Sequence, residues 1–308
     1  MASIAEINGL TIPSSGGGFT GLLDETYGSG AAAAYSTRRL ASATTVLLRV
    51  RRVTGTGNTG NDDEANFKFD PLTDDLTLSS PIDDAGSSSA TNLGQFLNAT
   101  GYTDADNLIN IADGFVDTWT DQSGNSNDAG QNTPESQPQI FDSSSPTDLI
   151  KENGKSALSF DGSNDFLSLT STASTNSVCQ ILVSVYDTSV STLKMPLGGG
   201  SFWQHYGGNR MRIRTTSGDV SFITGLTNGD QFLCFMNANS GAYTAHLNGT
   251  SKFSGNRGSW YINQIGRGLN NNTYAFDNVI QEVILYESDQ SSNRSDIETN
   301  INSDFGIY

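Results

Sequence analysis

The stretch Trp119–Gly130, WTDQSGNSNDAG, and the later stretch Ser156–Leu169, SALSFDGSNDFLSL, share one local pattern. Each joins a short run of β-forming residues to a polar turn rich in Asp, Asn and Gly. Apolar runs that alternate with such turns are typical of antiparallel strands. We therefore expect these two stretches to lie at the centre of a β-rich fold.

The apolar runs that follow predict the strands of the second half. Val178–Tyr186 and Gln231–Met236 are nearly continuous apolar runs, as expected of central strands that are buried on both faces. Tyr243–Leu247 and Thr250–Phe253 are joined through Asn248–Gly249, a dipeptide that strongly favours a β-hairpin. We predict an all-β protein, an antiparallel jelly-roll β-sandwich.

Helices are predicted at only a few places. Thr91–Ala99 carries its apolar residues on one side and predicts a short internal helix. Ser288–Phe305, with Gly306 directly after it, predicts a C-terminal helix. Ala31–Leu40 leaves two possibilities open, a short helix or a packed irregular segment.

The chain divides into an arm and one sandwich. Residues 1–18 carry spaced apolar residues and end in the flexible SSGGG segment at Ser14–Gly18, so we interpret them as an N-terminal docking arm. An edge strand of the same domain is the alternative. Residues 19–308 are expected to form the β-sandwich, with residues 19–150 as a first half with long loops and residues 151–308 as its strand-rich core.

Composition and charge exclude several classes of protein. The formal net charge is −17, which disfavours binding to nucleic acid and to anionic membranes. No run approaches the roughly 20 apolar residues of a membrane span. The N-terminus has no basic segment followed by an apolar one, so we expect no signal peptide and synthesis in a host cytoplasm. Cys179 and Cys234 lie in apolar runs and are expected as buried free thiols, although a bond between neighbouring strands stays open.

Two parts of the sequence resemble known families. Residues 155–308, with SFDGSNDFLSL and VIQEVILYESDQ before the terminal helix, resemble a concanavalin A-like (laminin-G-like) jelly roll, a fold that recurs in carbohydrate-binding modules. Residues 21–141, with AAAAYSTRRL and TWTDQSGNSNDAG followed by QPQI, resemble the first part of the α-L-arabinofuranosidase catalytic-domain family. The same order of motifs is similar to a group of tailed-bacteriophage virion proteins, which implies a virion protein with this sandwich.

The resemblance to the enzymes does not extend to their nucleophile. A retaining glycosidase needs two carboxyl groups about 5 Å apart, and the resembled enzymes use a glutamate nucleophile in the later part of the sandwich. No glutamate occurs between Asn153 and Gln281, and Glu282 matches a structural strand of the jelly roll. We therefore expect no catalytic residues and no enzyme. A hydrolase in which an aspartate replaces the nucleophile is the alternative.

Aromatic residues near glycine-rich turns are the candidates for binding glycans. Trp203, His205 and Tyr206 lie in a segment bounded by glycines, and Trp260 and Tyr261 follow another Gly/Asn turn. Exposed rings of this kind stack on sugar rings. The alternative is that these rings fill the core or the ends of the sandwich.

The turn after Phe160 is the only candidate for a bound ion. Asp161, Asn164 and Asp165 offer oxygen ligands of the kind that calcium prefers. A turn closed by Asp and Asn side chains explains the same residues without a metal. No other cofactor is expected.

The function predicted from these features is a structural protein of the bacteriophage virion surface: a fibre, a tail tip or a capsid decoration. The arm at residues 1–18 would dock onto other virion proteins, and the jelly roll would self-associate, as a homotrimer by analogy with fibres, or face host surface glycans. An arabinofuranosidase-like glycoside hydrolase and a free lectin-like carbohydrate-binding protein are the alternatives.

Overall fold

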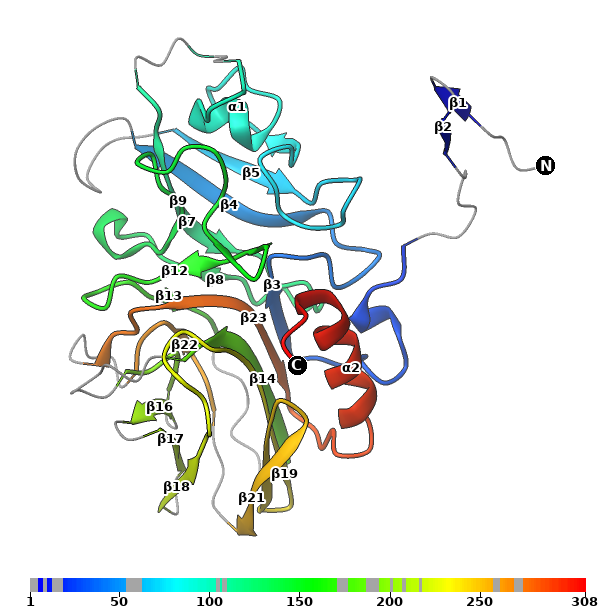
Figure 1. Cartoon of the computed structure of the whole chain (residues 1–308), viewed down its shortest axis with the longest axis vertical. Helices are drawn as coiled ribbons and strands as arrows, with labels where there is room; N and C mark the ends of the chain where they lie inside the picture. The colour runs from blue at the N-terminus through cyan, green and yellow to red at the C-terminus, as the bar shows by residue number, and fades with distance from the viewer. Residues whose placement is uncertain are drawn as a thin grey trace.

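The structure is a computed structural model of the whole chain, and it describes residues 5–7, 10–12, 19–53, 63–103, 106, 110–170, 177–186, 194–199, 202–206, 209–215, 218–256, 261–268 and 274–308. Nearly every element is a strand (Figure 1). The prediction of an antiparallel β-sandwich with a short internal helix and a C-terminal helix is confirmed.

The elements of the first half are β1 (Ala5–Ile7), β2 (Leu10–Ile12), η1 (Leu22–Asp24), β3 (Ala33–Ser36), β4 (Val46–Val53), β5 (Glu64–Lys68), β6 (Ile82–Asp84), α1 (Leu93–Leu97), β7 (Asp113–Trp119), β8 (Ala129–Gly130), η2 (Pro134–Ser136) and β9 (Gln139–Phe141). Those of the second half are β10 (Lys151–Glu152), β11 (Lys155–Ser156), β12 (Leu158–Ser159), β13 (Leu167–Ser168), β14 (Val178–Val185), β15 (Leu197–Gly198), β16 (Phe202–Tyr206), β17 (Arg210–Thr215), β18 (Gly218–Ile223), β19 (Gln231–Asn239), β20 (Ala242–Leu247), β21 (Thr250–Asn256), β22 (Gln264–Ile265), β23 (Val279–Tyr286) and α2 (Arg294–Phe305).

The central strand β14 pairs with β19 on one side and with β23 on the other. Its two faces contact different cores. Leu182 belongs to the main core, whereas Ile181 and Val183 belong to a second core under helix α2, together with Ile297 and Ile301 (Figure 1). All eight residues of β14 are buried, which explains why its sequence is nearly continuously apolar.

The two cysteines lie on opposite faces of this central sheet. Cys179 packs in the second core and Cys234 in the main core, and both are free thiols. The expectation of buried free thiols is confirmed, and the placement rules out a bond between them. Burial raises the pKa of both thiols well above the ordinary value, so neither is a reactive thiolate.

Side chains of the Trp119–Gly130 stretch hold β3 in the sandwich by hydrogen bonds. The Trp119 indole N–H donates to the carbonyl of Ser36 (3.1 Å), and Asp121 Oδ1 accepts the backbone N–H of Ala34 (2.9 Å). The Gln122 side chain accepts the N–H of Leu40 (2.7 Å) and donates to the carbonyl of Ser36 (3.2 Å). Strand β3 is thereby held in register against β23.

This placement corrects the expectation for Ala31–Leu40, because its centre is the strand β3 and not a helix or an irregular segment. Alanine favours helices on its own. Here the pairing of β3 with β23 and the side-chain bonds from the 119–122 stretch outweigh that preference.

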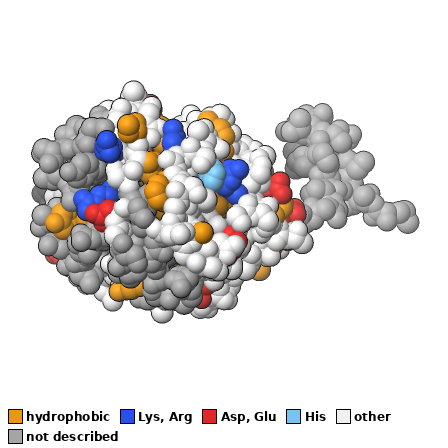
Figure 2. All heavy atoms as spheres, turned by 90° about the horizontal axis from the view of Figure 1, so that it is seen from below, with side chains coloured by type: hydrophobic (Ala, Val, Ile, Leu, Met, Phe, Trp, Pro, Cys, Tyr) orange, Lys and Arg blue, Asp and Glu red, His pale blue; other side chains and the backbone are white. Residues whose placement is uncertain are grey.

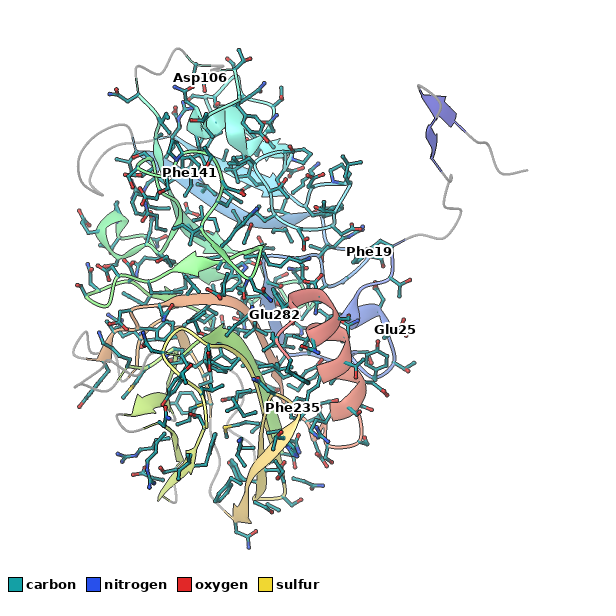
Figure 3. The ribbon with its side chains drawn as sticks, in the orientation of Figure 1. Phe19, Glu25, Asp106, Phe141, Phe235 and Glu282 are labelled. Carbon is teal, nitrogen blue, oxygen red and sulfur yellow. The ribbon has the colours of Figure 1, made fainter. Side chains whose placement is uncertain are left out.

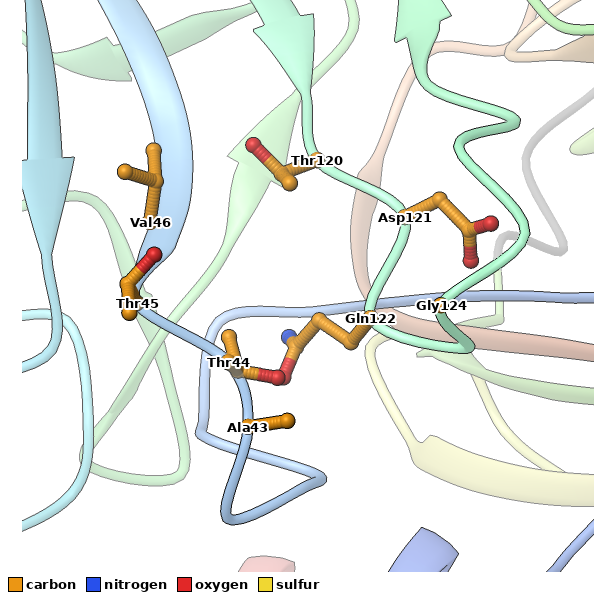
Figure 4. Close-up of a pocket in the computed structure, with 8 residues that line it drawn as sticks. All are labelled: Ala43, Thr44, Thr45, Val46, Thr120, Asp121, Gln122 and Gly124. Carbon is orange, nitrogen blue, oxygen red and sulfur yellow. The ribbon is translucent and has the colours of Figure 1, made fainter.

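A hollow of about 180 Å³ lies beside the same stretch and is lined by residues 43–46, 120–122 and 124. In Figure 4 the Gln122 side chain extends toward Thr44, whereas the Asp121 carboxylate points away from it. The Gln122 amide already bonds to the backbone of Arg38 and Leu40. We therefore interpret this hollow as a consequence of how this stretch packs against the segment after β3, and not as a ligand site.

The main core includes residues of both halves, such as Phe67 and Trp119 from the first and Leu182 and Phe232 from the second. On the surface seen from below, apolar and charged side chains are scattered singly or in small groups over the described part of the chain (Figure 2). Strands β1 and β2 pair with each other, and the other residues of the predicted arm lie outside the described part of the chain.

Candidate functional site

The acidic turn, residues 161–165, connects β12 to β13 and is closed by its own carboxylates. Asp161 Oδ1 accepts the backbone N–H groups of Ser163 (2.8 Å), Asn164 (3.1 Å) and Asp165 (3.3 Å). Asp165 Oδ2 accepts the N–H of Asp161 in return (3.0 Å). The two carboxyl groups are therefore held next to each other by the backbone that connects them.

Asp165 is the more unusual of the pair because its side chain is buried. The residue is only 5% exposed, and burial, followed by the neighbouring charge of Asp161, raises its pKa from 3.8 to about 7. The N–H of Asp161 opposes this shift. A carboxyl group with such a pKa is partly protonated at neutral pH and can donate a proton.

Two further charged residues lie against the turn. Lys194 Nζ forms an ion pair with Asp277 Oδ2 (2.9 Å), and Asp277 Oδ1 is buried without a hydrogen-bond partner in the described part of the chain. Gly162 has a φ of +74°, and a side chain there would collide with Asp277. Sequence reasoning missed Asp277 and Lys194, because neither belongs to a motif and both are distant from the turn along the chain.

The turn adjoins the sheet edge formed by β13, β22 and β15. The Arg267 guanidinium stacks on the ring of Phe166, 3.4 Å from its centroid. Tyr261, one of the predicted glycan-binding residues, is partly exposed just before β22, and its carbonyl passes close to Gly199. Because β13 and β22 are antiparallel, the acidic turn lies beside the end of β22, whereas Tyr261 lies beside the end of β13, away from the turn.

The other predicted aromatic residues are only partly covered by the structure. Trp203, His205 and Tyr206 lie on β16, where their backbones pair with Ile213, Met211 and Arg210 of β17. Their side chains, and the whole of Trp260, lie outside the described residues. Glycan binding by these rings stays a prediction.

The contacts of the predicted calcium ligands are those of a closed turn. The Asn164 amide donates to the carbonyl of Glu135 (2.8 Å) and to Ser136 Oγ (3.2 Å). Within the ranges that the structure describes, no cluster of three or more His, Cys, Asp or Glu side chains is arranged to hold a metal. The alternative of a metal-free turn explains these contacts, and calcium at Asp161, Asn164 and Asp165 stays an untested prediction.

A second carboxyl group with a raised pKa, Asp117, is less suited to chemistry. Burial raises its pKa to about 6, against a hydrogen bond from Thr118. Arg49 lies between Asp117 and Glu64 and forms ion pairs with both. Because the guanidinium occupies the space between these carboxylates, no substrate atom can be placed there. The acidic turn is therefore the better candidate.

The burial of Asp165 predicts a dependence of stability on pH. Between its unfolded pKa of 3.8 and its folded pKa of about 7 the folded state binds more protons, so the free energy of unfolding falls as pH rises through this window. In Asp165→Asn this contribution is absent. Urea unfolding of both proteins at several pH values measures the difference, and equal pH slopes would contradict the burial of this group.

No protein-family model matches the sequence, and none of the curated proteins matches it. Solved structures do match. An arabinofuranosidase in complex with arabinofuranosyl-α-1,2-xylobiose has a TM-score of 0.55 and 12% identity, over 89% of this chain and 62% of that one. A glycoside hydrolase family 54 α-L-arabinofuranosidase with a cyclic sulfate inhibitor has a TM-score of 0.55 and 13% identity, over 89% and 63%. The chain thus spans about three-fifths of the length of these enzymes, and at this identity the likeness shows the fold.

The comparison supports the predicted sandwich and corrects one expectation. The chain was expected to be no enzyme, but the proteins that share its fold over 89% of its length are glycoside hydrolases. The expectation rested on the absence of a glutamate between Asn153 and Gln281. The predicted virion origin and surface location are not addressed by these similarities. No helix in the described residues is long and apolar enough to cross a membrane.

Proposed function

We propose that this chain is a glycoside hydrolase in which the acidic turn supplies both reacting carboxyl groups. The observation that carries the proposal is Asp165, a buried carboxyl group with a pKa of about 7 beside the charged Asp161. Two adjacent carboxyl groups with separate environments are what a glycosidase needs for an acid and an ionised partner.

In the proposed reaction Asp165 donates its proton to the glycosidic oxygen as the bond from that oxygen to the anomeric carbon breaks. Asp161 Oδ2, which has no hydrogen-bond partner among the described residues, bonds to the anomeric carbon. Water then releases the sugar as Asp165 takes a proton from it. Because the two residues close one turn, we assign them to the retaining mechanism, which requires carboxyl groups about 5 Å apart, and not to the inverting one.

The substrate class proposed is the α-L-arabinofuranosides. Support comes from the enzymes that share the fold, one of which was solved with arabinofuranosyl-α-1,2-xylobiose. The net charge of −17 favours neutral over anionic glycans. Tyr261 is partly exposed and stays a candidate to bind a glycan, but it lies at the other end of β22 from the acidic turn.

The assay that tests the proposal is the release of 4-nitrophenol from 4-nitrophenyl α-L-arabinofuranoside by the purified full chain. We expect saturable release, and on arabinofuranosyl-α-1,2-xylobiose a kcat/KM that falls above about pH 7, where Asp165 loses its proton. The matching β-D-xylopyranoside is the control and should be cleaved far more slowly. Absence of release from the arabinofuranoside and from arabinofuranosyl-α-1,2-xylobiose at every pH would overturn the proposal.

We also propose that the N-terminal arm docks this chain onto another protein at the virion surface. Strands β1 and β2 pair with each other, and an isolated two-stranded hairpin is only marginally stable in water. A partner surface would stabilise it. Immunogold microscopy of phage particles tests this location, and antibody label confined to the soluble lysate would count against it.

A further inference from the structure

A second cavity shares no lining residue with the acidic turn and is lined mostly by polar residues. It has a volume of about 480 Å³, within the range of ligand sites in proteins. It is lined by residues from the β10–β11 turn, the segment before β19, the β20–β21 turn and the C-terminal segment: Glu152, Asn153, Leu226, Gly229, Asp230, Gln231, Asn248, Gly306 and Ile307.

The backbone fixes how two of the lining amides are oriented. The Asn153 side-chain N–H group donates to the carbonyls of Phe305 (2.6 Å) and Gly306 (3.1 Å), so Asn153 Oδ1 is its remaining acceptor. Asn248 Oδ1 accepts the N–H of Leu233 (2.9 Å), so the Asn248 side-chain N–H group is its remaining donor. Neither remaining atom has a hydrogen-bond partner in the described part of the chain.

The orientation of Gln231 follows from a chain of hydrogen bonds. The Gln281 side-chain N–H group donates to the carbonyls of Glu152 (3.0 Å) and Lys155 (3.1 Å). Gln281 Oε1 therefore accepts from the Gln231 side-chain N–H group (2.5 Å). Gln231 Oε1 is left buried without a partner among the described residues. A buried polar atom of this kind costs stability unless a ligand or water satisfies it.

The lining carboxylates make the cavity rich in acceptors. Glu152 forms no ion pair or hydrogen bond through its carboxylate with the described residues, and burial raises its pKa. Asp230 accepts the N–H (2.7 Å) and the hydroxyl (2.9 Å) of Thr227. None of the described residues that line the cavity is a lysine or arginine, so its carboxylates would repel an anion. Leu226 and Ile307 supply apolar contact area.

We propose that this cavity binds a small neutral saccharide. Sugar hydroxyls donate hydrogen bonds to Asn153 Oδ1, Gln231 Oε1 and Glu152, and one hydroxyl accepts from the Asn248 amide. The C–H face of the ring packs against Leu226 and Ile307. The site is separate from the acidic turn and gives the chain a second place to hold a glycan.

The test is calorimetric titration of the full chain carrying Asp165→Asn with xylobiose, L-arabinose and glucuronate. The substitution prevents turnover at the acidic turn. We expect xylobiose or L-arabinose to bind and glucuronate to bind at least about 10-fold more weakly, because two carboxylates repel it. The additional substitutions Gln231→Met and Glu152→Gln, which keep side-chain size, should each weaken binding by about 10-fold or more.

Lys151→Gln is the matched control, because Lys151 is exposed beside Glu152 but does not line the cavity. The affinity of this variant for the neutral sugars should equal that of the parent. Thermal unfolding confirms that each variant is folded. The inference is overturned if neither neutral sugar binds, if both cavity variants bind as the parent does, or if glucuronate binds equally well. Restoring Asp165 should leave the cavity affinity unchanged, which separates this site from the proposed active site.

Discussion

Replacing Glu282 by alanine is expected to lower the free energy of unfolding by about 3–5 kcal/mol, the usual cost of breaking a buried ion pair. Glu282 lies on β23 with no exposed surface (Figure 3). It accepts hydrogen bonds from Arg38 Nε (2.8 Å), Arg38 Nη2 (3.2 Å) and Ser36 Oγ (2.8 Å). Without it the buried guanidinium loses its nearest carboxylate and keeps only the longer ion pair with Asp304 (3.8 Å).

Urea unfolding followed by circular dichroism measures this change. Glu25→Ala is the matched control, because Glu25 lies in a surface turn and its side chain forms no hydrogen bond or ion pair with the described residues; we expect a change below about 0.5 kcal/mol. The double variant Arg38→Met/Glu282→Leu should recover much of the loss, because apolar residues of similar volume remove both charges. A loss below about 1 kcal/mol in Glu282→Ala would contradict the assigned role.

This ion pair illustrates what the sequence can and cannot predict. VIQEVILY predicts the strand β23, and the apolar residues around Glu282 indicate that it is buried. Its partner cannot be predicted, because Arg38 is far away along the chain and lies in a segment that was expected to be a helix or irregular. The pairing of β3 with β23 brings them together, and that register depends on bonds made by Asp121 and Gln122.

The strands of the second half could be predicted because their apolar runs and turn residues depend only on residues that are close together along the chain. Val178–Tyr186 is apolar except at Gln180 and Ser184, and its two faces are covered by the main core and by the second core. Asn248 and Gly249 adopt φ angles of +49° and +70°, as the hairpin turn requires. Such features depend on neighbouring residues, which the sequence shows directly.

The candidate site, too, could be predicted only in part from the sequence. The turn from Asp161 to Asp165 was found because an Asp and Asn turn between two β runs is a local signal. Its chemistry was not, because the raised pKa of Asp165 results from burial in the folded chain. Asp277 lies against the turn at Gly162, and this contact cannot be predicted from the spacing of residues along the chain. The catalytic role proposed for Asp165 therefore depends on burial, which the sequence does not show.

Replacing Asp165 by asparagine is expected to lower kcat/KM on arabinofuranosyl-α-1,2-xylobiose by about 10²- to 10⁴-fold, the usual contribution of general acid catalysis to the step that breaks the glycosidic bond. Asparagine keeps the side-chain oxygen that accepts the N–H of Asp161, so the turn can still close. It has no proton to donate to the leaving sugar hydroxyl. On 4-nitrophenyl α-L-arabinofuranoside the loss should be much smaller, because nitrophenolate leaves without being protonated. Steady-state kinetics on both substrates measure the two losses.

The ratio of the two losses distinguishes a proton donor from a residue that only supports the turn. If Asp165 served only to close the turn, its replacement would disturb both substrates equally, because the geometry of bond cleavage would change for each. Asp142→Asn is the matched control: Asp142 Oδ1 accepts the N–H of Ser144 (2.8 Å) in a surface turn of the same kind, and its replacement should leave both rates unchanged. In the wild-type protein we expect kcat/KM on arabinofuranosyl-α-1,2-xylobiose to fall near pH 7. Loss of this pH dependence in Asp165→Asn would show that Asp165 supplies the proton.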